Sequence, residues 1–186
     1  MPRPVTDLAP VDELIQVRET QHGGFRGAPP VVGGARVGAA INKSCILMLS
    51  ALLQGHVEDV FIYFSQRLFA NLRTDENIER YRATLFRWGN PSSQNITSLF
   101  MRLGIIDVFD GITWQRTRAE TVKAKLDQIN KLRNKIAHGQ SLPQSVSLTQ
   151  VRDLRNFVEN FGERFAAHVR SKFPSVPRVR PKRSRS

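Results

Sequence analysis

The sequence predicts an all-α protein: a helical bundle of about four to five main helices, with a flexible N-terminal arm and a disordered basic C-terminal tail. Three observations predict this class. Apolar residues recur every three or four positions over several long stretches, which is the period of one helix face. Glycine, proline and helix-capping residues separate these stretches. No stretch alternates apolar and polar residues as a half-buried strand does.

The N-terminal part of the chain reads as an arm rather than as core. Residues 1–35 contain five of the ten prolines and two glycine pairs. Such a composition favours turns over long helices. We therefore expect a loosely attached arm over residues 1–35, with one short helix around Val11 to Gln21, and a helical domain over residues 36–173.

The first main helix is expected from about Arg36 to Leu72, where apolar residues recur with a helical period and predict a long, deeply buried element. A second helix is expected after Thr74, whose hydroxyl can accept a hydrogen bond from an unpaired N–H. Its apolar positions run to Trp88, and residues 89–91 (Gly-Asn-Pro) are expected to end it.

Three further segments complete the expected domain. Ser92 and Ser93 can cap a short helix that stops at Gly104, whereas residues 105–114 fit no single pattern. A strongly charged helix is expected over residues 117–137. Residues 147–150 (Ser-Leu-Thr-Gln) have the spacing of a capping box, so a last long helix should begin there. Residues 174–186 have no apolar period, three prolines and no acid, which predicts a disordered basic tail.

Charge and composition narrow the function classes. The formal net charge is +12, and the Lys and Arg residues from Arg170 onward supply seven of these charges. This balance favours a polyanionic partner, although solubility alone would also account for it. The single cysteine, Cys45, excludes an internal disulfide framework and fits a reducing, cytoplasmic compartment. We expect no membrane segment, because no apolar run approaches the roughly 20 residues that one needs.

Cofactor and metal sites are not expected. The Gly33-Gly34 pair lacks the preceding strand and the following Lys-Ser/Thr of a phosphate-binding loop. Neither His22 nor His168 has a cysteine or a second histidine at ligand spacing, so a zinc site is not expected.

The segment Arg133-Asn-Lys-Ile-Ala-His138-Gly139 gathers a guanidinium, an amide, an ammonium and an imidazole at the end of one helix. Asn134 and His138 are four residues apart and share a face. Arg133 and His138 are five apart, roughly 140° from each other at about 100° per residue, so the long Arg side chain or local unwinding must bring them together. The alternative is structural: Arg133 and Lys135 would favour the helix macrodipole, and His138 would cap the helix before a glycine.

This segment resembles the R-(four to six residues)-H motif of the HEPN superfamily in its RNxIAHG form, as found in the RiboL-PSP-HEPN and related MAE-like branches beside prokaryotic defence genes. The resemblance covers about residues 36–173, with a long apolar helix before the motif and a capped helix after it. It implies a helical bundle and a homodimer whose two motifs face one cleft. Gly55-His-Val-Glu58 resembles the S-H-x-E element of such families, with Gly55 replacing the serine; a shift of four residues would place the acid at Gln54 instead. Both His56 and Glu58 equally fit a polar notch in the core.

The resemblance implies a metal-independent endoribonuclease, a toxin or defence effector, that cleaves RNA through the 2′-OH. His138 would act as acid/base, since a free imidazole has a pKa of about 6.5, and Arg133 would stabilise the phosphate charge. Asn134 would orient His138 or hold a phosphate oxygen, Glu58 would belong to the site, and Lys131 and Lys135 would follow the RNA backbone. Expected partners are RNA, a second copy and a cognate antitoxin or other defence protein.

Two alternatives to the nuclease stay open. In the first, the same cleft belongs to a non-catalytic HEPN module that binds RNA, nucleotide or a partner protein. In the second, the domain is only a dimerising scaffold, and the arm or the tail does the binding.

Overall fold

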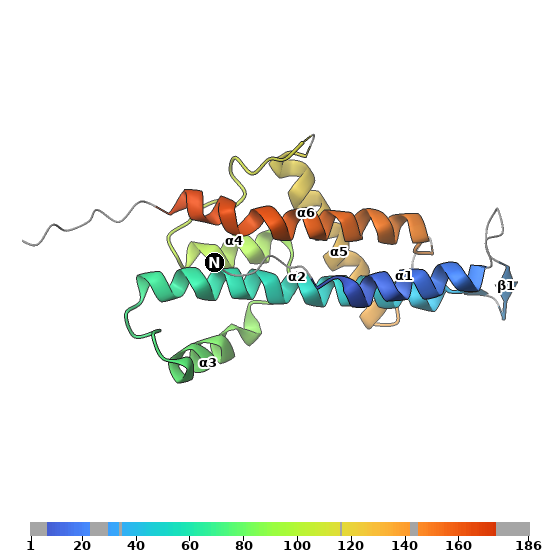
Figure 1. Cartoon of the computed structure of the whole chain (residues 1–186), viewed down its shortest axis with the longest axis horizontal. Helices are drawn as coiled ribbons and strands as arrows, with labels where there is room; N and C mark the ends of the chain where they lie inside the picture. The colour runs from blue at the N-terminus through green and yellow to red at the C-terminus, as the bar shows by residue number, and fades with distance from the viewer. Residues whose placement is uncertain (1–6, 23–29, 34, 116, 142–144, 174–186) are drawn as a thin grey trace, which may run out of the picture.

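A computed structural model describes residues 7–22, 30–33, 35–115, 117–141 and 145–173, and it confirms the predicted all-α class (Figure 1). Its elements are α1 (Ala9–His22), β1 (Val31–Val32), β2 (Ala35–Arg36), α2 (Ala39–Leu68), α3 (Asp75–Ala83), the 3₁₀ helix η1 (Thr84–Arg87), α4 (Ser93–Met101), α5 (Ala119–Ala137) and α6 (Leu148–Lys172). The two short strands pair antiparallel, Val31 with Arg36 and Val32 with Ala35. The predicted tail, residues 174–186, lies outside the described residues.

Helix α2 is the centre of the bundle. It packs against α1, α5 and α6, with α6 running alongside it and α5 crossing it (Figure 1). Aromatic side chains fill the space between α2, α4 and α6: Phe100 meets Phe61 and Phe165 edge-on at 5.7 and 5.3 Å between ring centroids, and Phe161 stacks on Phe165 at 4.6 Å. Such ring pairs add to the free energy gained from area burial alone. The rings therefore couple α2, α4 and α6 into one core.

The composition of α2 differs from the expectation that no stretch is apolar enough to span a membrane. Its most apolar 18-residue window has a mean hydropathy of 1.5, which by length and composition alone would suffice for a membrane crossing. However, 56% of that window is buried inside the bundle. A helix that is surrounded by neighbouring helices is apolar on most of its sides, as a membrane helix is, because most of its side chains are shielded from water. Its composition therefore matches its place as the core helix.

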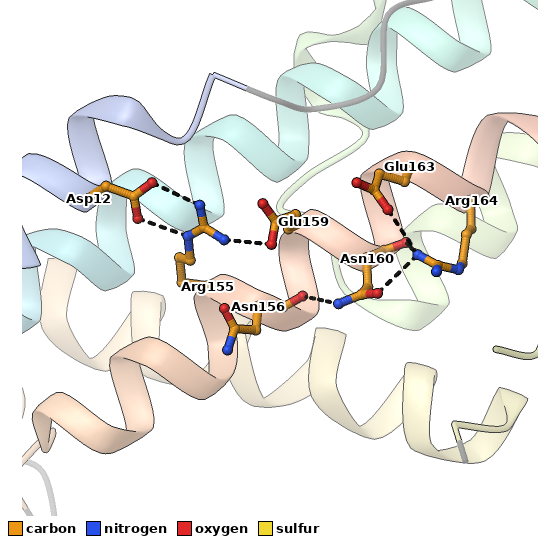
Figure 2. A network of polar contacts seen from close by, with 7 residues as sticks. All are labelled: Asp12, Arg155, Asn156, Glu159, Asn160, Glu163 and Arg164. Atoms are coloured by element: carbon orange, nitrogen blue, oxygen red, sulfur yellow. Dashed lines mark hydrogen bonds and ion pairs between the residues drawn. The ribbon is translucent and has the colours of Figure 1, made fainter. Parts of the chain in front are cut away.

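Helix α1 also differs from the expectation of a loosely attached arm. Leu8, Val11 and Ile15 are buried in the main core. A second reason for this docking is polar: Arg155 of α6 donates from Nε and Nη2 to the two carboxylate oxygens of Asp12, both at 2.8 Å (Figure 2). Residues 8–22 thus belong to the bundle. Residues 1–6, 23–29 and 34 of the expected arm lie outside the described residues.

Arg155 also reaches along its own helix, donating from Nη1 to Glu159 at 2.5 Å, so one guanidinium holds an acid from each of two helices (Figure 2). Attraction to these acids is reflected in the pKa of Arg155, which the hydrogen bond to Asp12 raises above its ordinary value. The side chain is therefore a charged junction between α1 and α6.

Three predicted helix starts are confirmed by their caps. The hydroxyls of Thr74, Ser92 and Ser147 accept from the backbone N–H three residues later, at 3.3, 3.1 and 3.1 Å. The helix after Thr74 ends earlier than expected, because α3 stops at Ala83 and the chain tightens into η1. The ambiguous stretch after Gly104 contributes to the core: its buried side chains are Ile105, Val108, Phe109, Ile112 and Trp114.

Candidate functional site

The Arg133–His138 segment forms the last turn of α5, and its end is fixed by the backbone. Gln140 N–H donates to the Lys135 carbonyl at 2.9 Å, and Gly139 N–H donates to the Ile136 carbonyl at 3.1 Å. These two bonds, with Gly139 at φ +63°, are those of a Schellman motif. The helix therefore continues to Ala137, and His138 itself leaves α geometry at φ −91° and ψ 9°. The helix thus does not unwind between Arg133 and Ala137, although local unwinding was one of the two ways expected to bring Arg133 and His138 together.

The burial pattern of α5 decides which motif side chains reach solvent. Val122, Leu126 and Ile129 are buried against the core. The stripe continues with partly buried residues in the last two turns, so Arg133 and Asn134 are partly buried while His138 is exposed. The imidazole at the helix end is thus open to a ligand from solvent.

Asn134 holds Arg133 rather than His138. Its Oδ1 accepts from Arg133 Nη1 at 3.2 Å and from Asn90 Nδ2 at 2.9 Å, and its Nδ2 donates to Asn130 at 3.4 Å. No hydrogen bond joins Asn134 or Arg133 to the His138 side chain within the described part of the chain. The structure therefore places the three motif residues at one helix end, with His138 as the C-cap, and among the described residues it pairs only Arg133 with Asn134.

The cations of the motif determine the charge of this helix end. In the parts of the chain that the structure describes, no carboxylate lies within ion-pair distance of Arg133, Lys131 or Lys135. The neighbouring acid on the same helix, Asp127, accepts instead from the backbone N–H and hydroxyl of Ser93, both at 2.8 Å. The end of α5 is consequently a surface of uncompensated positive charge, which attracts anions.

Glu58 lies on α2 and contacts a different element. Its Oε1 accepts from Trp88 Nε1 at 2.7 Å and from Gln54 Nε2 at 3.1 Å. The two positions considered for the family acid therefore touch each other, one turn apart. No contact joins Glu58 directly to Arg133 or His138 among the described residues. Its link to the motif runs through the segment that carries Trp88.

That segment supplies the residues that the sequence analysis missed. Trp88 was read there only as an apolar helix position, and Asn90 only as part of a helix end. In the structure, Trp88 binds Glu58 of α2, and Asn90 binds Asn134 of α5, so two residues on either side of Gly89 connect the two helices. Gly89 has φ +89°, and an added Cβ there would lie 2.7 Å from Asn95 Nδ2. The sequence signal that could have identified Asn90 is its position as a polar residue within a Gly-Asn-Pro turn.

The other titratable side chains lie away from the motif. His168 Nε2 is 2.9 Å from the Val108 carbonyl oxygen, and burial lowers the pKa of its imidazole. Burial also raises the pKa of the Cys45 thiol. Among the described residues there is no group of three or more His, Cys, Asp or Glu side chains that could hold a metal ion. The side chain of His22 lies outside the described residues.

The family model described as RiboL-PSP-HEPN matches residues 35–171, a range that contains α2, the Trp88–Asn90 segment, the end of α5 and α6. No curated protein and no solved structure gives a significant match.

Proposed function

Because the chain belongs to the RiboL-PSP-HEPN family, we propose that it is a metal-independent endoribonuclease that uses the end of α5. One observation carries the proposal: among the described residues Arg133 has no carboxylate partner and is held by Asn134, while the exposed His138 stands at the fixed end of the same helix. A guanidinium without an acid is available to a phosphate, and an exposed imidazole is available to a hydroxyl.

The proposed reaction is a transesterification within the RNA, in which the 2′-oxygen replaces the 5′-oxygen on the phosphorus. His138 accepts the proton of a ribose 2′-OH, whose oxygen then forms a bond to the adjacent phosphorus while the bond from phosphorus to the 5′-oxygen breaks. An imidazolium returns a proton to the leaving 5′-oxygen. Arg133 donates to the phosphate oxygens, where negative charge grows. The products are a 2′,3′-cyclic phosphate and a 5′-OH.

The remaining residues have supporting roles. Lys131 and Lys135 contact neighbouring phosphates, since each neutralised phosphate releases a condensed counterion. Asn134 positions Arg133. This role replaces the expected one, in which Asn134 would orient His138 or hold a phosphate oxygen. Glu58 is a positioning residue that holds Trp88 and, through it, the segment that carries Asn90.

The direct test is RNA cleavage in the presence of a chelator, with analysis of the product ends. We expect cyclic phosphate and 5′-OH ends, and a rate lowered roughly 10²–10⁴-fold by His138→Ala. Gln140→Ala, an exposed change two residues away, is the matched control and should retain the wild-type rate. Arg133→Ala is paired with Arg118→Ala, which removes an exposed cation at the other end of α5.

Three outcomes would each contradict a part of this proposal. Activity that disappears with chelator and returns with magnesium contradicts the metal-independent reaction. Salt-dependent RNA binding without cleavage supports a non-catalytic HEPN module at the same positive surface. An unchanged rate in His138→Ala would leave this residue as a helix cap only.

The biological setting that we propose is that of a toxin or defence effector controlled by a cognate antitoxin or other defence protein. The support is the family itself and a positive surface that an acidic partner can cover. Expression of the wild-type chain in bacteria should arrest growth, whereas expression of His138→Ala should not.

A further inference from the structure

The N-terminus of α2 lacks the usual compensation of a helix start. Its N-cap is Gly38 at φ 78°, no side chain caps it, and its first turn contains no acidic residue. The Asn42 N–H donates to the Gly38 carbonyl at 3.2 Å. The N–H groups of residues 39–41 make no hydrogen bond within the described part of the chain. The positive end of a 30-residue helix is therefore open.

Arg18 of α1 lies against this helix end. The residue is only 4% exposed, and its Nε and Nη1 are buried without a hydrogen-bond partner. A Cβ added at Gly38 would lie 2.3 Å from Arg18 Nε and 2.7 Å from Cζ, so the guanidinium occupies the space that any other residue at position 38 would need. The close approach fixes the guanidinium beside the first turn of α2.

This arrangement is electrostatically unbalanced. A buried guanidinium without an acid is unfavourable, and the neighbouring positive helix end makes it more so. The adjacent acid on α1, Glu19, is paired with Arg152 of α6. No carboxylate in the described residues lies within ion-pair distance of Arg18. An anion placed here would satisfy the guanidinium and the helix end together.

Asn42 adds a requirement on the chemistry of that anion. It stands one turn after Gly38 on the same side of α2, and its Nδ2 donates to the Val146 carbonyl at 2.8 Å. Its Oδ1 is buried and accepts no hydrogen bond. Arg18 thus offers donors and Asn42 offers an acceptor. A tetrahedral anion that also carries a hydroxyl matches both.

We propose that the junction of α1 and α2 is a binding site for a phosphate group that retains a proton, either inorganic phosphate or a phosphate monoester. Arg18 and the first N–H groups of α2 donate to its oxygens, and Asn42 Oδ1 accepts from its hydroxyl. A phosphodiester has no such hydroxyl and neither does sulfate at neutral pH, whereas a phosphate monoester keeps one below its second pKa of about 6. The site is formed by other residues than the Arg133–His138 motif and does not depend on the nuclease proposal.

The experiment measures thermal unfolding of the full chain in millimolar inorganic phosphate, with chloride keeping the ionic strength constant. We expect the Tm to rise by roughly 3–6 °C when phosphate exceeds its Kd about tenfold. Arg18→Met, which keeps the length but removes the charge, should lose this rise. Arg73→Met, at an exposed position away from the junction, is the matched control and should keep it.

Parallel titrations identify the ligand. Sulfate should raise the Tm less than phosphate. At a pH below about 6, where a monoester keeps one proton, a comparison of adenosine monophosphate with a dimethyl phosphate diester separates a monoester from a diester. The proposal is overturned if phosphate raises the Tm of the wild type and Arg18→Met equally, or if sulfate and the diester match phosphate. Should Arg18→Met not fold, Asn42→Ala decides: it must lose the preference for phosphate over sulfate, and retention of that preference overturns the assignment.

Discussion

At the scale of single residues, the geometry of the motif depends on an asparagine far from it in sequence. Asn90 donates to Asn134 Oδ1, the same atom that accepts from Arg133, and the Asn90 carbonyl in turn accepts from Asn95 Nδ2 at 2.8 Å. The amide of Asn134 therefore has one orientation that serves both neighbours. Asn90 therefore positions Arg133 through Asn134, without contacting Arg133 itself.

We expect Asn90→Ala to lower kcat for RNA cleavage about tenfold, with little change in KM, because a less fixed guanidinium costs on the order of 1 kcal/mol of transition-state stabilisation. Single-turnover and steady-state cleavage assays measure this split. Asn156→Ala, an exposed asparagine of α6, is the control and should leave both constants unchanged. Equal kcat in Asn90→Ala and wild type would show that Arg133 needs no such support.

The motif could be predicted from sequence, but its supports could not. Arg133, Asn134 and His138 lie within six consecutive residues, so their place at one helix end follows from helical geometry. Asn90 and Asn134 are 44 residues apart, and Trp88 and Glu58 are 30 apart. Pairing at such separations is determined by the packing of α2, α4 and α5, which the sequence pattern does not contain. The sequence therefore predicted that Asn134 would orient His138 or hold a phosphate oxygen, and it did not indicate the contact with Asn90.

At the scale of elements, α6 holds the irregular segment between α4 and α5 through its last turns. His168 Nε2 lies 2.9 Å from the Val108 carbonyl, and Lys172 Nζ donates to Asp110 at 2.6 Å. Val108 and Phe109 are fully buried. The segment is thus fixed between two polar contacts and two apolar side chains.

This contact predicts a pH dependence of stability. Burial lowers the pKa of His168 in the folded protein, whereas in the unfolded chain it is about 6.5. As the pH falls below about 6.5, the unfolded state takes up a proton that the folded state does not, so the free energy of unfolding decreases until the folded pKa is passed.

Urea unfolding at a series of pH values measures this decrease. His168→Gln, whose amide can still donate to the Val108 carbonyl, should show a flatter profile in the same window. If the profile of the variant follows that of the wild type, protonation of His168 does not contribute to stability.

Helix starts were predictable, whereas docking was not. The caps at Thr74, Ser92 and Ser147 are local hydrogen bonds between residues three apart, so short sequence patterns identify them. Helix α1 was expected to be a loosely attached piece because glycine and proline surround it. Its place in the core comes from the burial of Leu8, Val11 and Ile15 and from the contact of Asp12 with Arg155, 143 residues later. Amino-acid composition indicates the local conformational preference of a segment, and it does not indicate a contact between residues so far apart in the chain.

At the scale of the whole molecule, the class and the family followed from the period of apolar residues and one motif, but the assembly is a further step. Within one chain, Arg133 is held by Asn134 and is not joined to the His138 side chain among the described residues. A two-fold axis beside the end of α5 would place each guanidinium near the imidazole of the second copy. We therefore propose a homodimer with two shared sites.

Mixing Arg133→Ala with His138→Ala should recover part of the cleavage activity, since a heterodimer contains one site with both residues intact. Sedimentation by ultracentrifugation should show a dimer that RNA or sulfate tightens, because an anion offsets repulsion between the two positive surfaces. The shared-site arrangement fails if a strict monomer cleaves RNA. A dimer without recovery supports two separate sites.

The hydrogen bond between Trp88 and Glu58 affects the intrinsic fluorescence of the protein. The chain has two tryptophans, and both indoles are buried: Trp88 is 6% exposed and Trp114 is 8% exposed. Trp114 packs near Phe157, at 6.2 Å between ring centroids, and belongs to the segment held by α6. Trp88 instead donates to a carboxylate and stands two residues from the asparagine that supports Arg133. Since indole emission responds to nearby charge, the fluorescence of Trp88 reports on the loop that connects α2 to the motif, without any attached label.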